Sequence, residues 1–286
     1  MSNLIDAAAL RERMDDPNLR IVDARFVLTD PPAGRAAYAG GHLPGAVYLH
    51  LDEDLSSPVR PDGIHGRHPL PDPETFAAWL GALGIGDEHD VVAYDDAGGA
   101  FAVRVWWLLR WLGRPNVRVL DGGLQAWLEA GGDVTTDVPD HPPARSTAHP
   151  IDAMVIDAEA LRDRLEDPET WIVDARAGER FRGETEPLDR KAGHVPGALN
   201  RPFTENLDDE GRFLSPAALR ARFEELAEAR EIVCYCGSGV TGAHDVLAIE
   251  EAGLGLPTLY AGSWSDWSSR PDYPVATGDE GDEHVA

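Results

Sequence analysis

Hydrophobic positions along the chain fall into short continuous runs that alternate with longer amphipathic stretches. One such run ends in Asp-Ala-Arg at residues 19–25, and another does so at residues 171–176. Short apolar runs bounded by turn signals are typical of strands buried on both faces of a parallel sheet. The alternation of such strands with amphipathic stretches predicts an α/β fold in which helices flank a parallel sheet.

The predicted elements come in the same order in each half of the chain. The predicted helices are Leu4–Met14, Pro73–Leu83, Ala100–Leu112, Ala158–Leu165, Pro216–Ala229 and Thr241–Ala252. The predicted strands are the two runs that end in Asp-Ala-Arg, the runs that begin at Val91 and Ile232, and the segments Val117–Leu120 and Thr258–Tyr260.

Four sequence blocks occur twice, in the same order. "LRIVDAR" returns as "WIVDAR", "GHLPGAV" as "GHVPGAL", "VVAYDDAGG" as "IVCYCGSG", and "DGGLQAW" as "AGSWSDW". An ordered internal repeat of this length indicates two copies of one domain. His42 and His194 occur in both copies, so we interpret them as structural residues of the repeated turn.

Composition suggests where the two copies end. The segment "TTDVPDHPPARSTAHP" is rich in Pro, Thr and Ser and has no hydrophobic period, which is typical of a linker. We therefore predict a first domain at residues 1–134, a linker at 135–152, a second domain at 153–276 and an acidic tail at 277–286.

Charge limits the classes of partner. The chain has 51 acidic and 25 basic residues, and its formal net charge is −26. Such a surface repels nucleic acid and anionic membranes, so neither is expected as a partner. The N-terminal sequence lacks the features of a signal peptide, and no apolar run approaches the roughly 20 residues of a membrane span. We expect a cytoplasmic protein without a cofactor or a metal, because no nucleotide motif and no metal-ligand spacing is present.

Both cysteines lie in the segment "CYCGSGVTGAH". Cys236 directly follows a predicted strand, at the sheet edge where α/β proteins bind ligands. Glycines in the next loop allow successive N–H groups to turn toward the sulfur, and the following helix adds its positive end. Both effects favour the thiolate, so we interpret Cys236 as a nucleophile and Cys234 as a core residue. Asp95 stands at the equivalent place in the first copy, which has no thiol there.

The repeated "VDAR", "GHLPGA" and "GHVPGA" blocks, the "CGSGVTG" loop and the "AGSWSDW" ending together resemble the tandem-domain rhodanese sulfurtransferases. The resemblance extends over nearly the whole chain and implies two rhodanese-like domains, of which only the second is catalytic. It also implies that Cys236 takes a sulfur atom from a donor as a persulfide. The persulfide then passes this sulfur to cyanide or to a thiol, such as thioredoxin or a low-molecular-weight thiol.

The loop after Cys236 indicates the donor. In this family, thiosulfate-using members tend to have cationic side chains after the cysteine, whereas a Cys-Gly-Ser-Gly-Val-Thr loop is typical of 3-mercaptopyruvate sulfurtransferases. Thiosulfate is a dianion whose charge lies next to the attacked sulfur, so a nearby Lys or Arg helps to bind it. The carboxylate of 3-mercaptopyruvate lies farther from its sulfur. The neutral loop of this chain therefore favours 3-mercaptopyruvate.

The resemblance also assigns roles to individual residues. It implies that Ser238 and His68 act with Cys236 in catalysis. The residues that it implies in substrate binding are Arg180, Gly237, Gly239, Val240, Thr241 and Arg190.

Two positions depart from the family pattern. The family aspartate that acts with the serine and histidine is replaced by His50, with Asp52 two residues away. A second family arginine is replaced by Leu188, and Arg190 follows two residues later.

Three other functions are possible for the sequence. A thiosulfate:cyanide sulfurtransferase is the alternative within the same enzyme class, and a non-catalytic rhodanese-like binding module is the alternative outside it. Cysteine phosphatases and arsenate reductases share a Cys-x5-Arg loop, but here the residue at the arginine position is Gly242. Without that arginine a phosphate dianion loses its bidentate partner.

Overall fold

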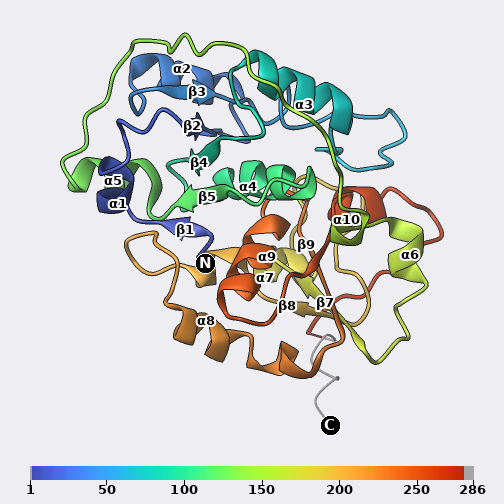
Figure 1. Cartoon of the computed structure of the whole chain (residues 1–286). Coiled ribbons are helices and arrows are strands. Elements are labelled where there is room, and N and C mark those ends of the chain that lie inside the picture. Colours follow the sequence, from blue (N-terminus) through green and yellow to red (C-terminus); the bar gives the residue numbers. More distant parts are fainter. Residues whose placement is uncertain (1, 280–286) are drawn as a thin grey trace. The chain divides into compact units, whose positions relative to one another are not determined.

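The computed structural model describes residues 2–279, which form two compact units (Figure 1). Unit 1 contains residues 2–57, 71–151 and 209–213, and unit 2 contains residues 58–70, 152–208 and 214–279. Residues 58–70 therefore belong to unit 2, although the elements of unit 1 precede and follow them in the sequence. Most of the acidic tail predicted at 277–286 lies outside the described residues.

Unit 1 is a parallel sheet of five strands in the order β1-β5-β4-β2-β3. Its elements are β1 (Leu4–Ile5), α1 (Ala7–Arg11), β2 (Leu19–Asp23), α2 (Pro32–Gly40), β3 (Ala46–Tyr48), α3 (Pro73–Ala82), β4 (Asp90–Tyr94), α4 (Ala102–Trp111), β5 (Val117–Leu120) and α5 (Gly123–Glu129). Helix α4 packs on β4 and β5, and α1 lies beside α5.

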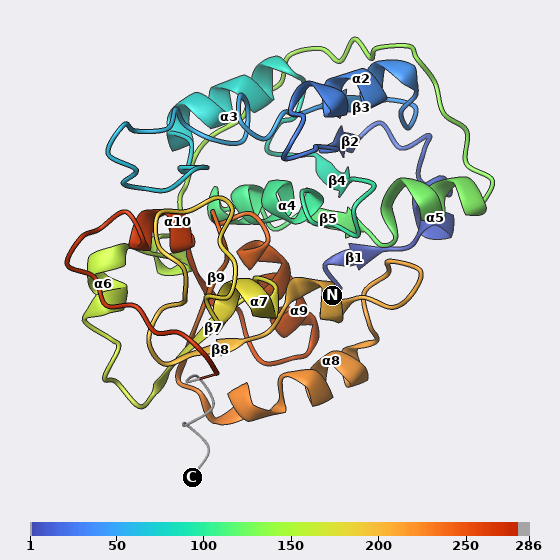
Figure 2. The ribbon, with the colours of Figure 1, turned by 180° about the vertical axis from the view of Figure 1, so that it is seen from behind.

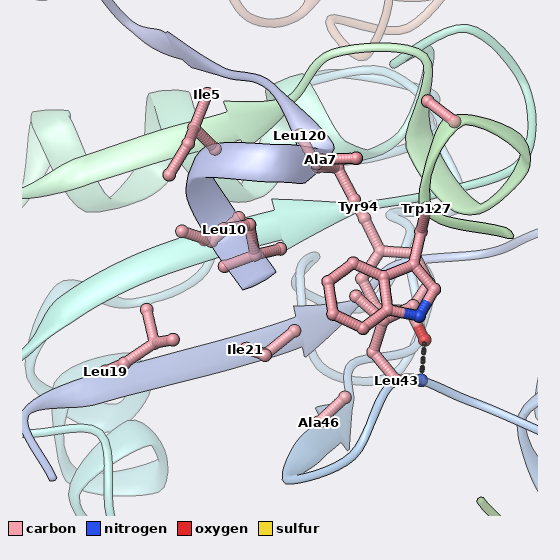
Figure 3. Close-up of a cluster of buried hydrophobic side chains, with 12 residues drawn as sticks. Ile5, Ala7, Leu10, Leu19, Ile21, Leu43, Ala46, Tyr94, Leu120 and Trp127 are labelled. Atoms are coloured by element: carbon pink, nitrogen blue, oxygen red, sulfur yellow. Dashed lines mark hydrogen bonds between the residues drawn. The ribbon is translucent and has the colours of Figure 1, made fainter. Parts of the chain in front are cut away.

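One hydrophobic cluster of unit 1 joins α1 and α5 to the strands (Figure 3). Leu10 of α1 is fully buried, and Trp127 of α5 is 2% exposed. The Tyr94 hydroxyl accepts a hydrogen bond from the Leu43 backbone N–H at 3.2 Å, so the end of β4 is joined to the segment before β3. Burial of a side chain the size of leucine stabilises the fold by about 1.5–3 kcal/mol.

Unit 2 repeats the same strand order as β6-β10-β9-β7-β8, again with all strands parallel. Its strands and α-helices are β6 (Val155–Ile156), α6 (Ala158–Arg162), β7 (Thr170–Asp174), α7 (Gly178–Phe181), β8 (Ala198–Asn200), α8 (Pro216–Arg222), β9 (Glu231–Tyr235), α9 (Gly242–Glu251), β10 (Thr258–Tyr260) and α10 (Ser263–Trp267). Short 3-10 turns cover Asp152–Met154, Phe203–Asn206 and Glu224–Glu228. Helix α9 packs on β9 and β10 and lies beside α8 (Figure 2). The predicted fold class, two α/β domains of the same design, is confirmed.

The repeated Asp-Ala-Arg block has a structural role in both units. In unit 2 the fully buried Asp174 forms a salt bridge with Arg176 at 2.6 Å, and Arg176 also donates to the carbonyl oxygen of Gly193 at 2.8 Å. Asp23 and Arg25 form the same 2.6 Å salt bridge in unit 1. The ion pair thus joins the end of β2 or β7 to the glycine of the repeated Gly-His-x-Pro-Gly turn. The two histidines of these turns are buried and stack on aromatic rings, Tyr38 and Phe181.

Several predicted boundaries differ from the structure. The helix predicted at Leu4–Met14 covers only Ala7–Arg11, because the Asp6 carboxylate accepts from the Ala9 N–H and starts the helix there. The two residues before Asp6 pair with β5 as strand β1. The predicted helix Pro216–Ala229 ends as an α-helix at Arg222 and continues as a 3-10 turn.

The segment predicted as a linker has no α-helix or regular strand, but it is hydrogen-bonded to unit 1. The Ala144 N–H donates to the Gly81 carbonyl, and the Asp87 N–H donates to the Arg145 carbonyl, both at 2.9 Å. The Thr147 hydroxyl donates to the Asp87 carboxylate at 2.8 Å. This segment therefore covers the surface of unit 1 rather than behaving as a free tether.

Candidate functional site

Cys236 lies directly after β9, the central strand of unit 2, and is 2% exposed. Its Sγ accepts hydrogen bonds from the backbone N–H of Gly239 at 3.2 Å and of Ser238 at 3.5 Å. These N–H groups stabilise a negative charge on the sulfur. The side chains of loop residues 237–242 are all uncharged.

The loop curls at Gly239, which has a positive φ. Gly239 has φ +77°, and a Cβ there would lie 2.2 Å from the Ala261 carbonyl oxygen. A Cβ at Gly242, the first residue of α9, would lie 3.0 Å from Leu259 Cδ1 and 3.1 Å from the backbone carbonyl carbon of Tyr235. A larger residue at Gly239 would therefore push the loop away from the end of β10.

Segment 58–70 places His68 against this loop, within unit 2. A hydrogen bond of 2.7 Å joins His68 Nδ1 to Ser238 Oγ, and both side chains are buried. The segment can approach because Gly66, at φ +80°, has no Cβ: one there would lie 2.4 Å from the Gly262 carbonyl oxygen. Ser238 and His68, which the family resemblance implied in catalysis, are thus in direct contact.

Two guanidinium groups lie beside Gly237. A Cβ atom at position 237 would lie 2.9 Å from Arg67 Nη2 and 3.4 Å from Arg180 Nη1. The Asp189 carboxylate forms ion pairs with both arginines, and Glu186 holds Arg180 in a two-oxygen contact at 2.7 and 3.0 Å. Burial raises the pKa of Asp189, and the positive charge of Arg67 only partly offsets this rise.

The other predicted binding residues lie in or near the loop with different surroundings. Val240 is buried at 4% exposure, and Thr241 directly precedes α9 without a side-chain hydrogen bond to that helix. Arg190 is exposed and lies near Gly63, where a Cβ would be 3.5 Å from its Nη2. The structure therefore brings Arg180, but not Arg190, next to Gly237.

Unit 1 has a corresponding loop around Asp95. Gly98 has φ +65° where unit 2 has Gly239 at φ +77°, which supports the register of Asp95 on Cys236. The fully buried Asp95 carboxylate accepts four backbone N–H groups at 2.8–2.9 Å. The donors are those of Ala97, Gly99, Phe101 and Ala102. The loop of unit 1 thus surrounds an anionic side chain of its own.

His50 and Asp52 lie in unit 1. The His50 ring is buried, and its Nδ1 accepts the backbone N–H of Asp52 at 3.2 Å while its Nε2 lies 3.2 Å from the Pro31 carbonyl oxygen. These contacts make His50 a structural residue of its own loop. Asp52 itself is exposed.

Sequence reasoning missed Arg67, Asp189 and Ser263. The only signal for Arg67 was its place directly before His68 in the sequence. Ser263 could have been found from its place in the "AGSWSDW" block, where its hydroxyl accepts the Cys236 N–H at 3.1 Å. Within residues 2–279, no group of His, Cys, Asp and Glu side chains is arranged to hold a metal ion. None of the helices in this range has the length and apolar character of a membrane span.

Comparison with known proteins identifies the family. The model of the rhodanese-like domain matches residues 6–130 and again residues 157–270. A Pseudomonas aeruginosa protein, provisionally named a 3-mercaptopyruvate sulfurtransferase, is 49% identical over 97% of this chain and 99% of its own length. A Mycobacterium tuberculosis protein, provisionally named a thiosulfate sulfurtransferase, is 40% identical over 96% of this chain and 97% of its own length.

Solved structures agree with the sequence comparison. The crystal structure of a 3-mercaptopyruvate sulfotransferase from Escherichia coli superposes with a TM-score of 0.80 at 31% identity. The match covers 92% of this chain and 99% of the Escherichia coli chain. The predicted family and the predicted sulfurtransferase class are confirmed, and this chain belongs to the rhodanese family.

Proposed function

We propose that this protein is a 3-mercaptopyruvate sulfurtransferase that works through a persulfide on Cys236. The observation that carries the proposal is that the cations of the site come from outside the Cys236 loop. Loop residues 237–242 are uncharged, and the guanidinium groups of Arg67 and Arg180 lie beside Gly237. A donor whose carboxylate is separated from its thiol matches this arrangement better than one whose charge adjoins the sulfur.

The proposed first step breaks a carbon–sulfur bond. The Cys236 thiolate attacks the thiol sulfur of 3-mercaptopyruvate, a sulfur–sulfur bond forms, and the carbon–sulfur electron pair leaves as the enolate of pyruvate. The enolate carbon takes up one proton, which gives pyruvate. The Ser238 hydroxyl, joined to His68 at 2.7 Å, is the group that delivers or relays this proton.

The second step returns the thiolate. A thiol or cyanide attacks the outer sulfur of the persulfide, and the sulfur–sulfur bond breaks with its electron pair on Cys236. The acceptor leaves as its own persulfide or as thiocyanate. Thioredoxin or a low-molecular-weight thiol is the acceptor class that we propose for the cell.

The Asp95 carboxylate in the loop of unit 1 is an analogue of the proposed persulfide on Cys236. The Oδ atoms of Asp95 are three bonds from its Cα, and the outer sulfur of a cysteine persulfide is equally far from its own Cα. The Asp95 oxygens are surrounded by N–H groups of the loop. In register, those of Gly99 and Phe101 correspond to Val240 and Gly242 of unit 2. A loop of this shape can therefore hold an anionic atom one bond beyond Sγ.

The donor comparison tests the proposal. Initial rates are measured with 3-mercaptopyruvate and with thiosulfate, each with cyanide as acceptor, for the native protein and for Cys236→Ser. We expect faster turnover of 3-mercaptopyruvate and its loss in Cys236→Ser, because serine cannot form a persulfide. Mass spectrometry of donor-treated protein should show one added sulfur atom in the native chain alone.

Thiosulfate remains the second candidate donor because of the name of the Mycobacterium tuberculosis relative. Faster turnover of thiosulfate would contradict the donor assignment but leave the Cys236 persulfide intact. Absence of activity with either donor, together with retained folding, would instead favour a rhodanese-like binding module.

A further inference from the structure

Arg67 lies directly before His68 in segment 58–70, far in the sequence from the Cys236 loop. It belongs to segment 58–70, where its backbone N–H donates to Ser265 Oγ at 3.1 Å. Its guanidinium pairs with Asp189, which is 122 residues away in the sequence. Other parts of unit 2 therefore hold Arg67 at both its backbone and its side-chain end.

The nitrogen atoms that Arg67 and Arg180 direct toward Gly237 are those that the protein itself does not use. In the described residues, Arg67 bonds to Asp189 through Nη1, and Arg180 bonds to Glu186 and Asp189 through Nε and Nη2. Arg67 Nη2 and Arg180 Nη1 have no such bond, and they lie 2.9 and 3.4 Å from the place of a Cβ at Gly237.

The carboxylates in this cluster fix the two guanidinium groups in one arrangement. Asp189 uses one oxygen for each arginine, and the side chains of Asp189 and Glu186 are 3% and 4% exposed. Glu186 is itself fixed, since its Oε1 accepts the backbone N–H groups of Leu188 and Asp189, both at 3.1 Å. The arginine side chains, at 27% and 18% exposure, remain the solvent-facing part of the cluster.

A carboxylate is the ligand that suits two such donors. Guanidinium groups bind planar carboxylates through directed, charge-assisted hydrogen bonds, and two groups held rigidly lose little entropy on binding. Because Gly237 has no side chain, the two guanidinium groups can approach the backbone of the residue that follows Cys236.

We propose that Arg67 is a substrate-binding residue that, together with Arg180, holds the carboxylate of an α-keto acid donor. Asp189 is the residue that positions both guanidinium groups for this contact. The inference rests on the proposed function, since it assigns a residue to the donor of that reaction.

The test compares a donor with and without its carboxylate. Wild type, Arg67→Ala and Arg67→Gln are assayed with 3-mercaptopyruvate and with mercaptoacetone, in which a methyl group replaces the carboxylate. We expect both variants to raise the KM for 3-mercaptopyruvate at least about tenfold, which corresponds to roughly 1.4 kcal/mol of lost binding. The kcat/KM for mercaptoacetone should stay within about twofold of the wild-type value.

Arg60→Gln is the matched control. Arg60 lies in the same segment 58–70 but is exposed and pairs locally with Asp62 at 2.8 Å. It should leave the KM for both donors unchanged. Arg67→Gln keeps the aliphatic stem and one hydrogen-bond donor for Asp189, so it decides the question if Arg67→Ala does not fold.

The possible failures are distinguishable. An equal loss of kcat/KM with both donors would mean that Arg67 only supports His68 or the loop. A wild-type KM for 3-mercaptopyruvate in Arg67→Gln would show that Arg67 does not bind the substrate. Either result overturns the role of Arg67 while the wild-type preference for 3-mercaptopyruvate still supports the proposed function. A wild-type protein that prefers thiosulfate would overturn the donor, and with it the inference.

Discussion

Ser263 shows how a single residue can hold the site at the cost of backbone strain. It is the first residue of α10 and has φ +53°, where unit 1 has Gly123 at φ +55°. A non-glycine residue in this region costs about 1–2 kcal/mol. Its hydroxyl donates to the Tyr260 carbonyl at 2.9 Å and accepts the Cys236 N–H at 3.1 Å. The two hydrogen bonds offset the strain and fix the backbone of Cys236.

Two substitutions of Ser263 should separate the backbone strain from the contribution of the hydrogen bonds. Ser263→Ala loses both hydrogen bonds and keeps the strained φ, whereas Ser263→Gly loses the bonds but removes the strain. We expect both variants to be less stable than wild type, with Ser263→Ala lower than Ser263→Gly by about 1 kcal/mol in the free energy of unfolding. Urea denaturation of the three proteins measures the order. An alanine variant as stable as the glycine variant would show that the backbone at this position is not strained.

Individual site residues were predictable in proportion to their closeness in sequence. Cys236 follows a predicted strand in a glycine-rich loop, so the pattern alone marks it, whereas Ser238 in the same loop was assigned its role by the family resemblance. His68 is 170 residues from Ser238, and only the family resemblance paired the two. Arg67 and Asp189 have no common motif, because their contact depends on how segment 58–70 folds onto unit 2. Physical contact between distant segments leaves no periodic signal in the sequence.

At the scale of elements, α9 both follows the Cys236 loop and carries a buried carboxyl group. Its N-terminus follows the Cys236 loop, and its first turn carries the fully buried Asp245. One Asp245 oxygen accepts from Asn206 Nδ2 at 2.7 Å, and the other has no hydrogen-bond partner in the described part of the chain. Burial raises the pKa of Asp245 to about 7, although the hydrogen bond from Asn206 acts in the opposite direction. The helix therefore contains a carboxyl group that titrates near neutral pH.

This group should make stability fall as pH rises. The folded protein holds the Asp245 proton up to about pH 7, whereas the unfolded chain releases it near the ordinary value of 3.8, so the folded state binds more protons between these pH values. We expect the free energy of unfolding of the wild type to fall by about 2–4 kcal/mol between pH 4.5 and pH 8, and we expect this fall to be absent in Asp245→Asn. Urea unfolding of both proteins across this range tests it. Parallel pH profiles for the two proteins would contradict the raised pKa.

The sequence pattern predicted the helices that are long and the strands that are buried on both faces of the sheet. The three central strands of each unit and the helices α3, α4 and α9 follow from continuous apolar runs and amphipathic stretches. The edge strands β1, β3, β6 and β8 have two or three residues each, too few to show a period. Helix α2 was missed because its sequence, "PAGRAAYAG", contains proline and glycine, although proline is favourable at a first helical turn. Short elements are specified by tertiary pairing rather than by local pattern.

At the scale of the whole molecule, the two copies have divided their tasks. Both keep the five-strand order, the buried Asp-Ala-Arg ion pair and the stacked histidine of the turn, which are the parts that maintain the fold. Only unit 2 keeps a thiol at the loop, and unit 1 fills the same cradle with Asp95. An aspartate can replace the cysteine without loss of loop shape because its carboxylate accepts the N–H groups that surround it.

The net charge of −26 affects the entire molecule. Many of its ion pairs are exposed, such as Arg35 with Glu53 and Arg60 with Asp62, and pairs of this kind contribute little to stability. We therefore expect the repulsion among the excess carboxylates to be the larger electrostatic contribution to the free energy of unfolding, and to destabilise the folded state. Added salt shortens the screening length from about 10 Å at 0.1 M to about 3 Å at 1 M.

Salt should consequently stabilise the protein. We expect the thermal midpoint at pH 7.5 to rise by roughly 3–6 °C between 0.02 M and 0.5 M NaCl, because screening weakens repulsion more than it weakens the exposed ion pairs. The matched control is the same titration near pH 4.6, the isoelectric point given by the sequence, where the net charge is small and the rise should disappear. An equal rise at both pH values would assign the effect to general salting-out instead. A midpoint that falls with salt at pH 7.5 would mean that the ion pairs, rather than the net charge, dominate the electrostatics of the fold.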